Sequence, residues 1–238
     1  MPKTWMQALA EYGDAGEILR DFRRQAQAAG VVRCALYVVP PFHSLENHFD
    51  NPFWWGYSEE RKSFYVRYRV IGRNRLAEMI LERGQVVLTR DAMDWVPQTD
   101  WFKSMRAEAL THHAEDGVAI PIFGPFGHRA LLIISFGEHL ADTNDARIEP
   151  IRQLAIAGHR AVMMRKRAEQ LPHEALTPTE IAVLRGVGKG ASNKEISRKM
   201  KISIHNVDAN LRRIFAKLGT TTRLQASFRA MELGLLRL

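Results

Sequence analysis

The last quarter of the chain has the most regular pattern of polar and apolar positions. Residues that can cap a helix recur between apolar runs, namely Thr177, Ser192, Ser203 and Thr222. Glu or Gln follows three of them at the third position, which completes a capping box. Pro178 suits a first helical turn, and Gly190 and Gly219 are typical of helix ends. The pattern predicts four short helices between Leu176 and Leu238.

The third of these helices is expected to have two different faces. Its apolar face repeats at helical spacing as Val207, Leu211, Ile214 and Leu218. The opposite face carries polar and small residues, namely His205, Asp208, Ala209, Arg212 and Ala216. In a DNA major groove an arginine can donate to guanine, and an acid can accept from cytosine N4. A preceding helix over 193–200, separated by a three-residue turn, completes the spacing of a helix-turn-helix.

Charge distinguishes this interpretation from its alternative, a small helical bundle with a solvated charged face. From His173 onward the chain carries twelve Lys and Arg against five Asp and Glu, whereas the residues before it carry twenty-two against twenty-one. Nearly all of the formal net charge of +8 therefore belongs to the four predicted helices. DNA binding requires an electrostatic footprint of this kind. The sequence predicts a DNA-binding domain here.

The first 170 residues mix short β-rich runs with amphipathic stretches. Helices are expected over 17–29, 58–69, 74–83, 98–113 and 144–169. Strands are expected over 31–39, 85–89, 117–123 and 129–136, the last two as a hairpin, and a loop over 43–55. Trp101, Phe102 and Met105 are expected to face the core. The predicted fold class is α+β, with an α/β/α sandwich on an antiparallel sheet and then a four-helix helix-turn-helix domain.

A short linker over 171–175, which contains Pro172, is expected to separate two domains at 1–170 and 176–238. The long helix before the linker has small and apolar residues at three-then-four spacing, namely Ile148, Ile151, Ala155, Gly158 and Val162. This stripe suits either the close approach of a second copy or packing against the domain's own sheet. The sequence leaves both open.

Several functional classes find no support in the sequence. No apolar run approaches the roughly twenty residues that span a bilayer. Residues 1–13 are too polar for a secretory signal, so we expect a cytoplasmic protein without membrane contact. No Gly-rich phosphate loop is present, and His112 and His113 with Glu115 and Asp116 are expected to mark a helix end instead of a metal site. We predict neither enzymatic activity nor a resident cofactor.

The segment 176–238 resembles the C-terminal DNA-binding domain of the LuxR family. The family pattern reads LTxxExxVL, then GxxNxEIAxxL, then ISxxTVxxHLxxIxxKLG. Matching positions are Leu176, Thr177, Glu180, Val183, Leu184, Gly190, Asn193, Glu195, Ile196, Ile202, Ser203, Val207, Leu211, Ile214, Lys217 and Leu218. Asn206 and Asn210 replace the usual threonine and histidine, and Asp208 stands where a basic residue is common. The resemblance implies a helix-turn-helix that reads double-stranded DNA.

By position in that family, His205, Asp208 and Arg212 are expected to face base edges. Candidate phosphate contacts are Lys189, Ser192, Lys194, Asn210, Arg213, Lys217 and Arg223. Two such units that read half-sites about one DNA turn apart need a two-fold axis. The resemblance therefore implies a homodimer on a palindromic operator, which regulates transcription together with RNA polymerase.

Placed before such a domain, residues 1–170 resemble the family's autoinducer-binding sensor domain. The strongest match is the run 117–122, followed by Gly127 and the run 129–132. The family's ligand pocket holds a Trp, a Tyr, an Asp-Pro pair and a second Trp. Those places hold Arg61, Tyr65, Asn74-Arg75 and Thr89 in this chain. An aromatic-rich segment that could line an acyl-chain pocket adds Trp55 and Tyr57 to the candidate ligand-binding residues.

These departures leave the ligand open. In the family, the first Trp donates to the lactone carbonyl and the Asp accepts from the ligand amide. Arg61 can also donate and Asn74 can accept, but a guanidinium buried beside an uncharged lactone needs a counter-charge. The sequence is compatible with an acyl-homoserine lactone held by altered contacts, with another small molecule such as an anionic one, or with no ligand.

Overall fold

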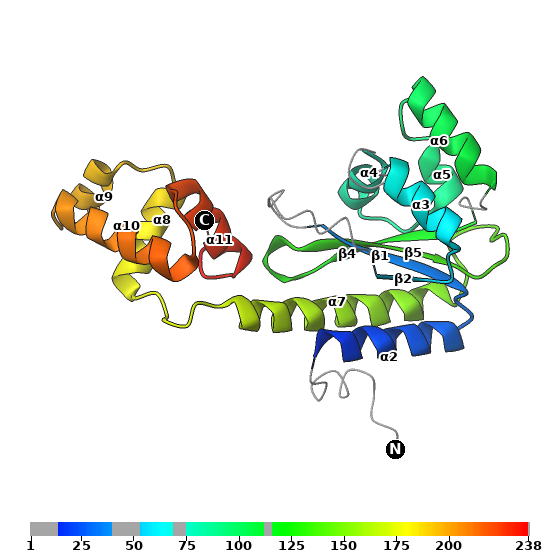
Figure 1. Ribbon diagram of the computed structural model, residues 1–238, viewed down its shortest axis with the longest axis horizontal. Helices are drawn as coiled ribbons and strands as arrows, with labels where there is room; N and C mark the ends of the chain where they lie inside the picture. The colour runs from blue at the N-terminus through cyan, green and yellow to red at the C-terminus, as the bar shows by residue number, and fades with distance from the viewer. Residues whose placement is uncertain (1–13, 40–52, 69–74, 112–115, 238) are drawn as a thin grey trace, which may run out of the picture. The chain divides into compact units, whose positions relative to one another are not determined.

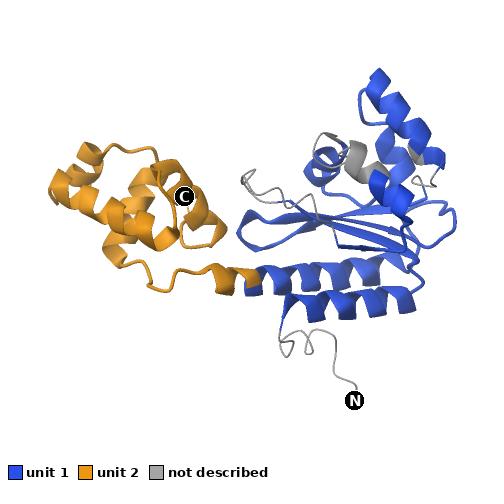
Figure 2. Ribbon diagram, viewed as in Figure 1, with its two compact units in different colours: residues 1–165 blue, residues 166–238 orange. Residues whose placement is uncertain are grey.

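The computed structural model describes residues 14–39, 53–68, 75–111 and 116–237 of the 238-residue chain. The chain divides into two compact units, Met1–Arg165 and Lys166–Leu238, which have different colours in Figure 2. In unit 1 helices cover an antiparallel sheet, and unit 2 is helical (Figure 1). The predicted α+β class is confirmed.

Unit 1 is built on a five-stranded sheet with the strand order β2-β1-β5-β4-β3, in which every neighbouring pair is antiparallel. The strands are β1 (Arg33–Val39), β2 (Phe53–Trp55), β3 (Val87–Leu88), β4 (Val118–Phe123) and β5 (Arg129–Ser135). β1 pairs with β5 along its whole length. The predicted hairpin is present as β4 and β5, joined through the short 3-10 helix η2 (Pro125–Gly127).

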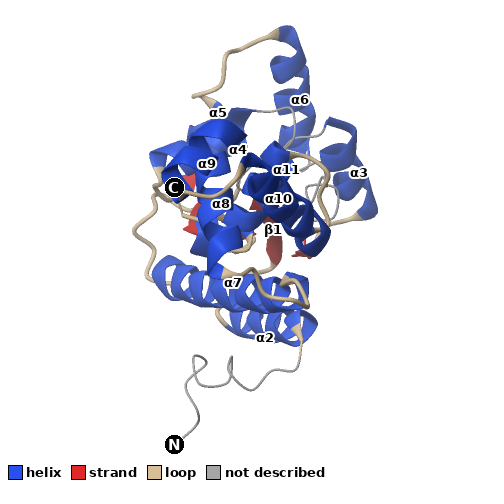
Figure 3. Ribbon diagram, turned by 90° about the vertical axis from the view of Figure 1, so that its left-hand side faces the viewer, coloured by secondary structure: helices blue, strands red, loops and turns tan. Residues whose placement is uncertain are grey.

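Helices cover both faces of this sheet. They are α2 (Ala15–Ala28), α3 (Glu59–Tyr68), α4 (Arg75–Arg83), α5 (Thr89–Met93), α6 (Asp100–Thr111) and α7 (Ile148–Gln170). α2 and α7 lie side by side against one face, as Figures 1 and 3 both show. α3, α4 and α5 lie over the other face (Figure 1), and α6 packs on α4 and α5 through Phe102 and Met105.

The apolar stripe of α7 is used inside unit 1. All five of its residues are buried. Ile148, Ile151 and Ala155 belong to the core between α7 and the sheet, and Val162 packs with Ile18 of α2. Of the two uses that the sequence left open, the structure therefore selects packing against the domain's own sheet and the neighbouring helix.

Three expectations for unit 1 are wrong. The predicted loop over 43–55 ends in β2, whose three residues add an edge strand to β1. The strand predicted over 85–89 is cut to two residues, because Thr89 already begins α5, a helix that the sequence pattern did not indicate. Trp101 is 41% exposed, because α6 rests on two helices and only a narrow stripe of it is covered.

Unit 2 forms its helices where the caps predict them. They are α8 (Pro178–Gly188), α9 (Asn193–Met200), α10 (Ile204–Leu218) and α11 (Arg223–Glu232). All four predicted caps accept a hydrogen bond from the backbone N–H three residues on, and three of them form complete capping boxes. Gly219 ends α10 in the left-handed conformation. The prediction of four helices is confirmed.

One hydrophobic core joins these four helices, and the predicted apolar face of α10 lies in it. α8 and α9 approach closely at Gly186, where an added Cβ would lie 2.8 Å from the side chain of Ile196. The four helices are each too short to be stable alone in water, so their shape depends on this shared core.

A buried ion pair joins the first turn of α8 to the last turn of α10. The Glu180 carboxylate accepts from Lys217 Nζ at 2.9 Å and from the backbone N–H of Thr177 at 2.8 Å. Lys217 also bonds Glu174 at 3.1 Å. Burial alone would raise the pKa of Glu180, but the hydrogen bonds from Thr177 and Lys217 outweigh burial and hold that pKa below its ordinary value.

We expect Lys217→Met to destabilise unit 2 by about 3 kcal/mol, because it leaves the Glu180 carboxylate buried without its ammonium partner. Hydrogen exchange of peptides from α8 and α10, followed by mass spectrometry in the full-length protein, should then be roughly a hundredfold faster at neutral pH. Because the pKa of Glu180 is lowered on folding, its contribution is present at neutral pH and is lost as the pH falls through the folded pKa. The difference in exchange rate between Lys217→Met and the wild type should therefore shrink as the pH is lowered.

Lys194→Met is the matched control, because Lys194 is exposed on α9 and has no ionic partner among the described residues. It should change the free energy of unfolding by no more than about 0.5 kcal/mol. Equal exchange rates in the two variants would mean that the Glu180–Lys217 pair does not hold α8 to α10.

Candidate nucleic-acid interface

The turn between α9 and α10 is held by bonds to the end of α9. Lys201 adopts the left-handed conformation with φ 55°. The backbone N–H of Ile202 donates to the carbonyl of Ser197 at 3.2 Å, and the Ser197 hydroxyl donates to the carbonyl of Ile202 at 2.6 Å. Ser203 then caps α10. This short, bonded turn fixes α10 relative to α9.

The face of α10 that was predicted to read DNA lies outside the core. His205 and Arg212 are exposed, and Asp208 is half-buried. Arg212 makes no hydrogen bond or ion pair with any residue that the structure describes. The Asp208 carboxylate accepts a hydrogen bond from the side-chain amide of Asn193 at 2.5 Å. The face therefore carries an unengaged guanidinium beside an oriented carboxylate.

One residue on this face was not predicted. Ile204, the first residue of α10, is 47% exposed and precedes His205. A large apolar side chain at such a place can contact the methyl group of thymine. The sequence pattern gave no signal for this exposure, because Ile204 lies three residues before Val207 and so continues the apolar repeat.

Three of the candidate phosphate contacts, Lys189, Ser192 and Lys194, are exposed near the N-terminus of α9. The Ser192 hydroxyl is already engaged, because it donates to Glu195 at 2.7 Å within the capping box. Lys199 and Lys201, which the sequence analysis missed, are also exposed, in the last turn of α9 and in the following turn. Several solvent-facing cations of unit 2 thus lie in or next to the helix-turn-helix.

The other four candidates have partners inside unit 2. Asn210 is 3% exposed and donates to the carbonyl of Asn206 at 2.7 Å. Lys217 is engaged by Glu180, and Arg213, although more exposed, bonds Asn210 at 3.0 Å and lies 3.4 Å from Glu180. Arg223 donates to the side chain of Asn193 and to the carbonyl of Ala191. The burial of Asn210 was predictable, because it lies three residues after Val207 and thus on the inner side of α10.

In unit 1 the structure brings two of the candidate ligand-binding residues together. Arg61 on α3 is 7% exposed, and its guanidinium carbon lies 4.8 Å from the centre of the Tyr57 ring. Tyr57 packs with Ala35 and Tyr37 on the face of the sheet covered by α3. Tyr65 is also part of α3, whereas Asn74 lies outside the described residues.

The structure separates Trp55 and Thr89 from this pair, which corrects the predicted set. Trp55 packs on the opposite face of the sheet, with Phe22 of α2 at 6.0 Å between ring centres, because it pairs with Cys34 of β1, which lies in the same core. The Thr89 hydroxyl accepts from the N–H of Gly117 and donates to its carbonyl, both at 3.1 Å. It therefore serves to close the end of the β3–β4 pair.

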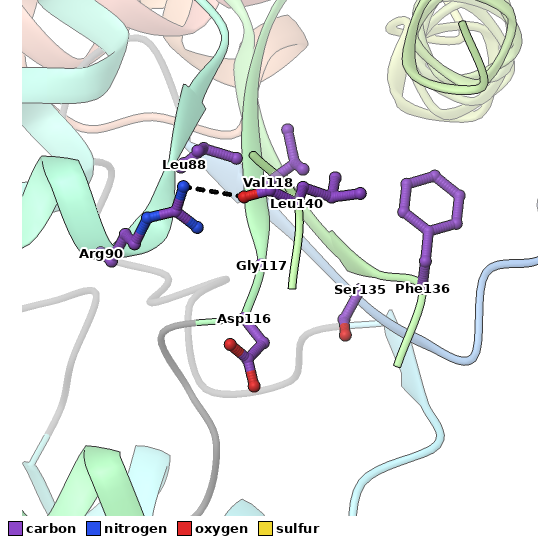
Figure 4. A pocket seen from close by; sticks show the side chains of 8 residues that line it. All are labelled: Leu88, Arg90, Asp116, Gly117, Val118, Ser135, Phe136 and Leu140. Atoms are coloured by element: carbon purple, nitrogen blue, oxygen red, sulfur yellow. Dashed lines mark hydrogen bonds between the residues drawn. The ribbon is translucent and has the colours of Figure 1, made fainter. Parts of the chain in front are cut away.

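A small hollow lies beside Thr89, at the ends of β3, β4 and β5 (Figure 4). Its volume is about 200 Å³ including open solvent, which is less than the roughly 300 Å³ of small ligand sites. Arg90, which lines it, donates to the carbonyls of Leu140 and Ala141 at 2.8 and 3.1 Å. We regard it as a packing gap instead of a ligand site.

The described parts of the chain contain no cluster of three or more His, Cys, Asp or Glu residues that could hold a metal ion. None of their helices is long and apolar enough to cross a membrane.

Sequence comparisons place unit 2 in a known family. Residues 174–230 match the family model described as "Bacterial regulatory proteins, luxR family". The "Transcriptional regulatory protein LiaR" of Bacillus subtilis is 32% identical over 121 residues, which cover 50% of this chain and 57% of LiaR. The "Putative HTH-type transcriptional regulator y4qH" of Sinorhizobium fredii is 30% identical over 145 residues, 59% of this chain and 43% of that protein. The chain thus spans about half the length of these curated relatives.

Solved structures match over nearly the whole chain. A crystal structure of Escherichia coli SdiA covers 95% of this chain, and 94% of SdiA is covered in turn, with a TM-score of 0.71 and 19% identity. SdiA in complex with octanoyl-rac-glycerol covers 97% of this chain and is covered over 93%, with a TM-score of 0.68 and 18% identity. These matches concern the fold. The match to the LuxR-family model covers residues 174–230 and therefore concerns the C-terminal helix-turn-helix, whereas the likeness of the whole chain to SdiA is one of fold.

Proposed function

We propose that this protein is a transcriptional regulator that binds double-stranded DNA through α10. The observation that carries the proposal is the exposed face of α10, on which Arg212 has no partner within the described residues. A guanidinium that its own domain leaves unengaged, in a basic helix-turn-helix, is available to a guanine edge. LiaR and y4qH are both named as transcriptional regulators, which supports this function.

In this proposal Ile204, His205, Asp208 and Arg212 face base edges. Phosphates are contacted by the exposed polar residues around α9, namely Lys189, Ser192, Lys194, Lys199 and Lys201. The protein acts in the cytoplasm, next to RNA polymerase, as a homodimer on a palindromic operator. Leu224 and Phe228 support a dimer, because both are exposed one turn apart on α11 and thus form an apolar surface outside the core of unit 2.

Residues 1–170 form the sensor in this proposal and residues 171–175 the linker to the DNA-binding domain at 176–238. The ligand site lies on the α3 face of the sheet and includes Arg61, Tyr57 and Tyr65. Arg61 would supply a hydrogen-bond donor to this site, and a carbonyl oxygen of an acyl-homoserine lactone could accept from it. The same buried charge favours a second candidate, a regulator that takes a different ligand or none.

The DNA-binding proposal is tested by Arg212→Ala and Lys194→Ala. Arg212→Ala should weaken binding to a selected site by about 1–3 kcal/mol and relax the preference at one base pair, because its contact is to a base edge. Lys194→Ala should weaken all sequences alike and reduce the salt slope by about one, because its contact is to a phosphate. Fluorescence anisotropy with a selected and a scrambled duplex, at several salt concentrations, measures both effects.

Lys103→Ala removes one exposed charge from unit 1 and should leave both quantities unchanged. An Arg212→Ala protein that kept its full discrimination between the two duplexes would remove Arg212 from the reading face.

The ligand proposal is tested by thermal unfolding of protein made in a host without homoserine lactones. A lactone at about 100 times its dissociation constant should add about 2.7 kcal/mol to the stability, which is several degrees in midpoint. The panel should vary acyl length and include octanoyl-rac-glycerol. Arg61→Met should abolish the shift, whereas Arg83→Met, which removes an exposed guanidinium stacked 3.7 Å from the ring centre of Trp95, should keep it. A folded protein that no lactone stabilises would support the second candidate.

A further inference from the structure

Three helices of unit 2 are joined by one chain of polar side chains. The guanidinium of Arg223, the first residue of α11, donates to the side-chain oxygen of Asn193, the first residue of α9. The amide nitrogen of Asn193 in turn donates to the carboxylate of Asp208 on α10, at 2.5 Å. Arg223 also donates to the carbonyl of Ala191, just before the cap of α9. This series of hydrogen bonds ends at Asp208, on the face of α10 that the proposed function assigns to DNA.

The direction of these hydrogen bonds follows from the groups themselves. A guanidinium can only donate and a carboxylate can only accept, so the amide between them must turn its oxygen to Arg223 and its NH₂ to Asp208. An amide orientation assigned in this way rests on the whole network and not on one contact. Asn193 therefore has a single arrangement that satisfies both neighbours, and this arrangement holds one carboxylate oxygen of Asp208 in place.

An acid on a DNA-binding face needs such support. Without a partner, the Asp208 carboxylate would be repelled by the phosphates on both sides of the groove and would turn away from the bases. The amide of Asn193 engages only the Oδ1 atom, and Oδ2 accepts no hydrogen bond within the described part of the chain. The held carboxylate thus keeps one acceptor atom without a partner in the described chain, and Asp208 lies four residues before Arg212 on the same side of α10.

We propose that Asn193 is a positioning residue that holds Asp208 as a hydrogen-bond acceptor for the N4 amino group of a cytosine in the operator. This inference rests on the proposed DNA-binding function. Cytosine offers a lone donor in the major groove, whereas adenine places the N7 acceptor beside its N6 donor, and guanine offers two acceptors. An oriented carboxylate is attracted to the amino group of cytosine and is repelled by the acceptor atoms of adenine and guanine.

The test exchanges the hydrogen-bond donor and acceptor between positions 193 and 208 in the full-length protein. Wild type, Asn193→Asp, Asp208→Asn and the double variant are each used to select from a randomised double-stranded DNA library, and base frequencies are read at every position. Asn193→Asp keeps an acceptor for Arg223 and is a favourable residue in a first helical turn, but it sets two carboxylates against each other. The preference for cytosine at one position of each half-site should fall about fivefold or more.

The double variant has the same net charge as the wild type and restores a hydrogen bond with its direction reversed. It should regain a strong preference at the same position, now for adenine, because an amide at position 208 can bond adenine N6 and N7 together. Lys199→Gln is the charge control, since it lowers the net charge by the same one unit at an exposed residue in the last turn of α9. It should weaken binding to all sequences without a change in base preference.

The outcomes separate this inference from the function on which it rests. A wild-type protein that selects no sequence would overturn the DNA-binding proposal itself. If the wild type selects a defined site and Asn193→Asp keeps the same base preferences, Asn193 only joins the helices. Persistence of the cytosine preference in Asp208→Asn would exclude Asp208 as its reader.

Discussion

A helix of eight residues does not keep its shape alone in water, and α9 has eight residues. Three interactions compensate. The capping box of Ser192 and Glu195 fixes its first turn, Ile196 inserts into the shared core beside Gly186, and Arg223 bonds its first residue from α11. α10 is held against α9 by the same core, so the reading face of α10 is presented by the packing of all four helices.

Positive charge has two uses in unit 2. Lys217 and Arg223 hold helices together through Glu180 and Asn193, whereas Lys194 and Arg212 point to solvent and have no ionic partner in the described chain. The net charge of the domain predicts DNA binding without separating these groups. The inner cations give unit 2 its shape, and the outer ones give it an electrostatic surface for a polyanion.

The range of an interaction along the sequence explains which features were predictable. A cap and the backbone N–H that donates to it lie three residues apart, so Thr177 and Ser192 mark their helices in the sequence itself. The partners of Lys217 and Arg223 lie 37 and 30 residues away, and only the folded core brings them together. Likewise, the face on which Trp55 lies depends on how β2 pairs with β1, which the pattern of a three-residue strand does not specify.

The central claim is that α10 reads DNA from the major groove. Methylation interference on a duplex selected by the full-length protein tests it most directly, because dimethyl sulfate modifies guanine N7 in the major groove and adenine N3 in the minor groove. The account predicts that methylated guanines within each half-site prevent binding, while methylated adenines are tolerated. Interference confined to adenine N3 would place the protein in the minor groove and contradict it.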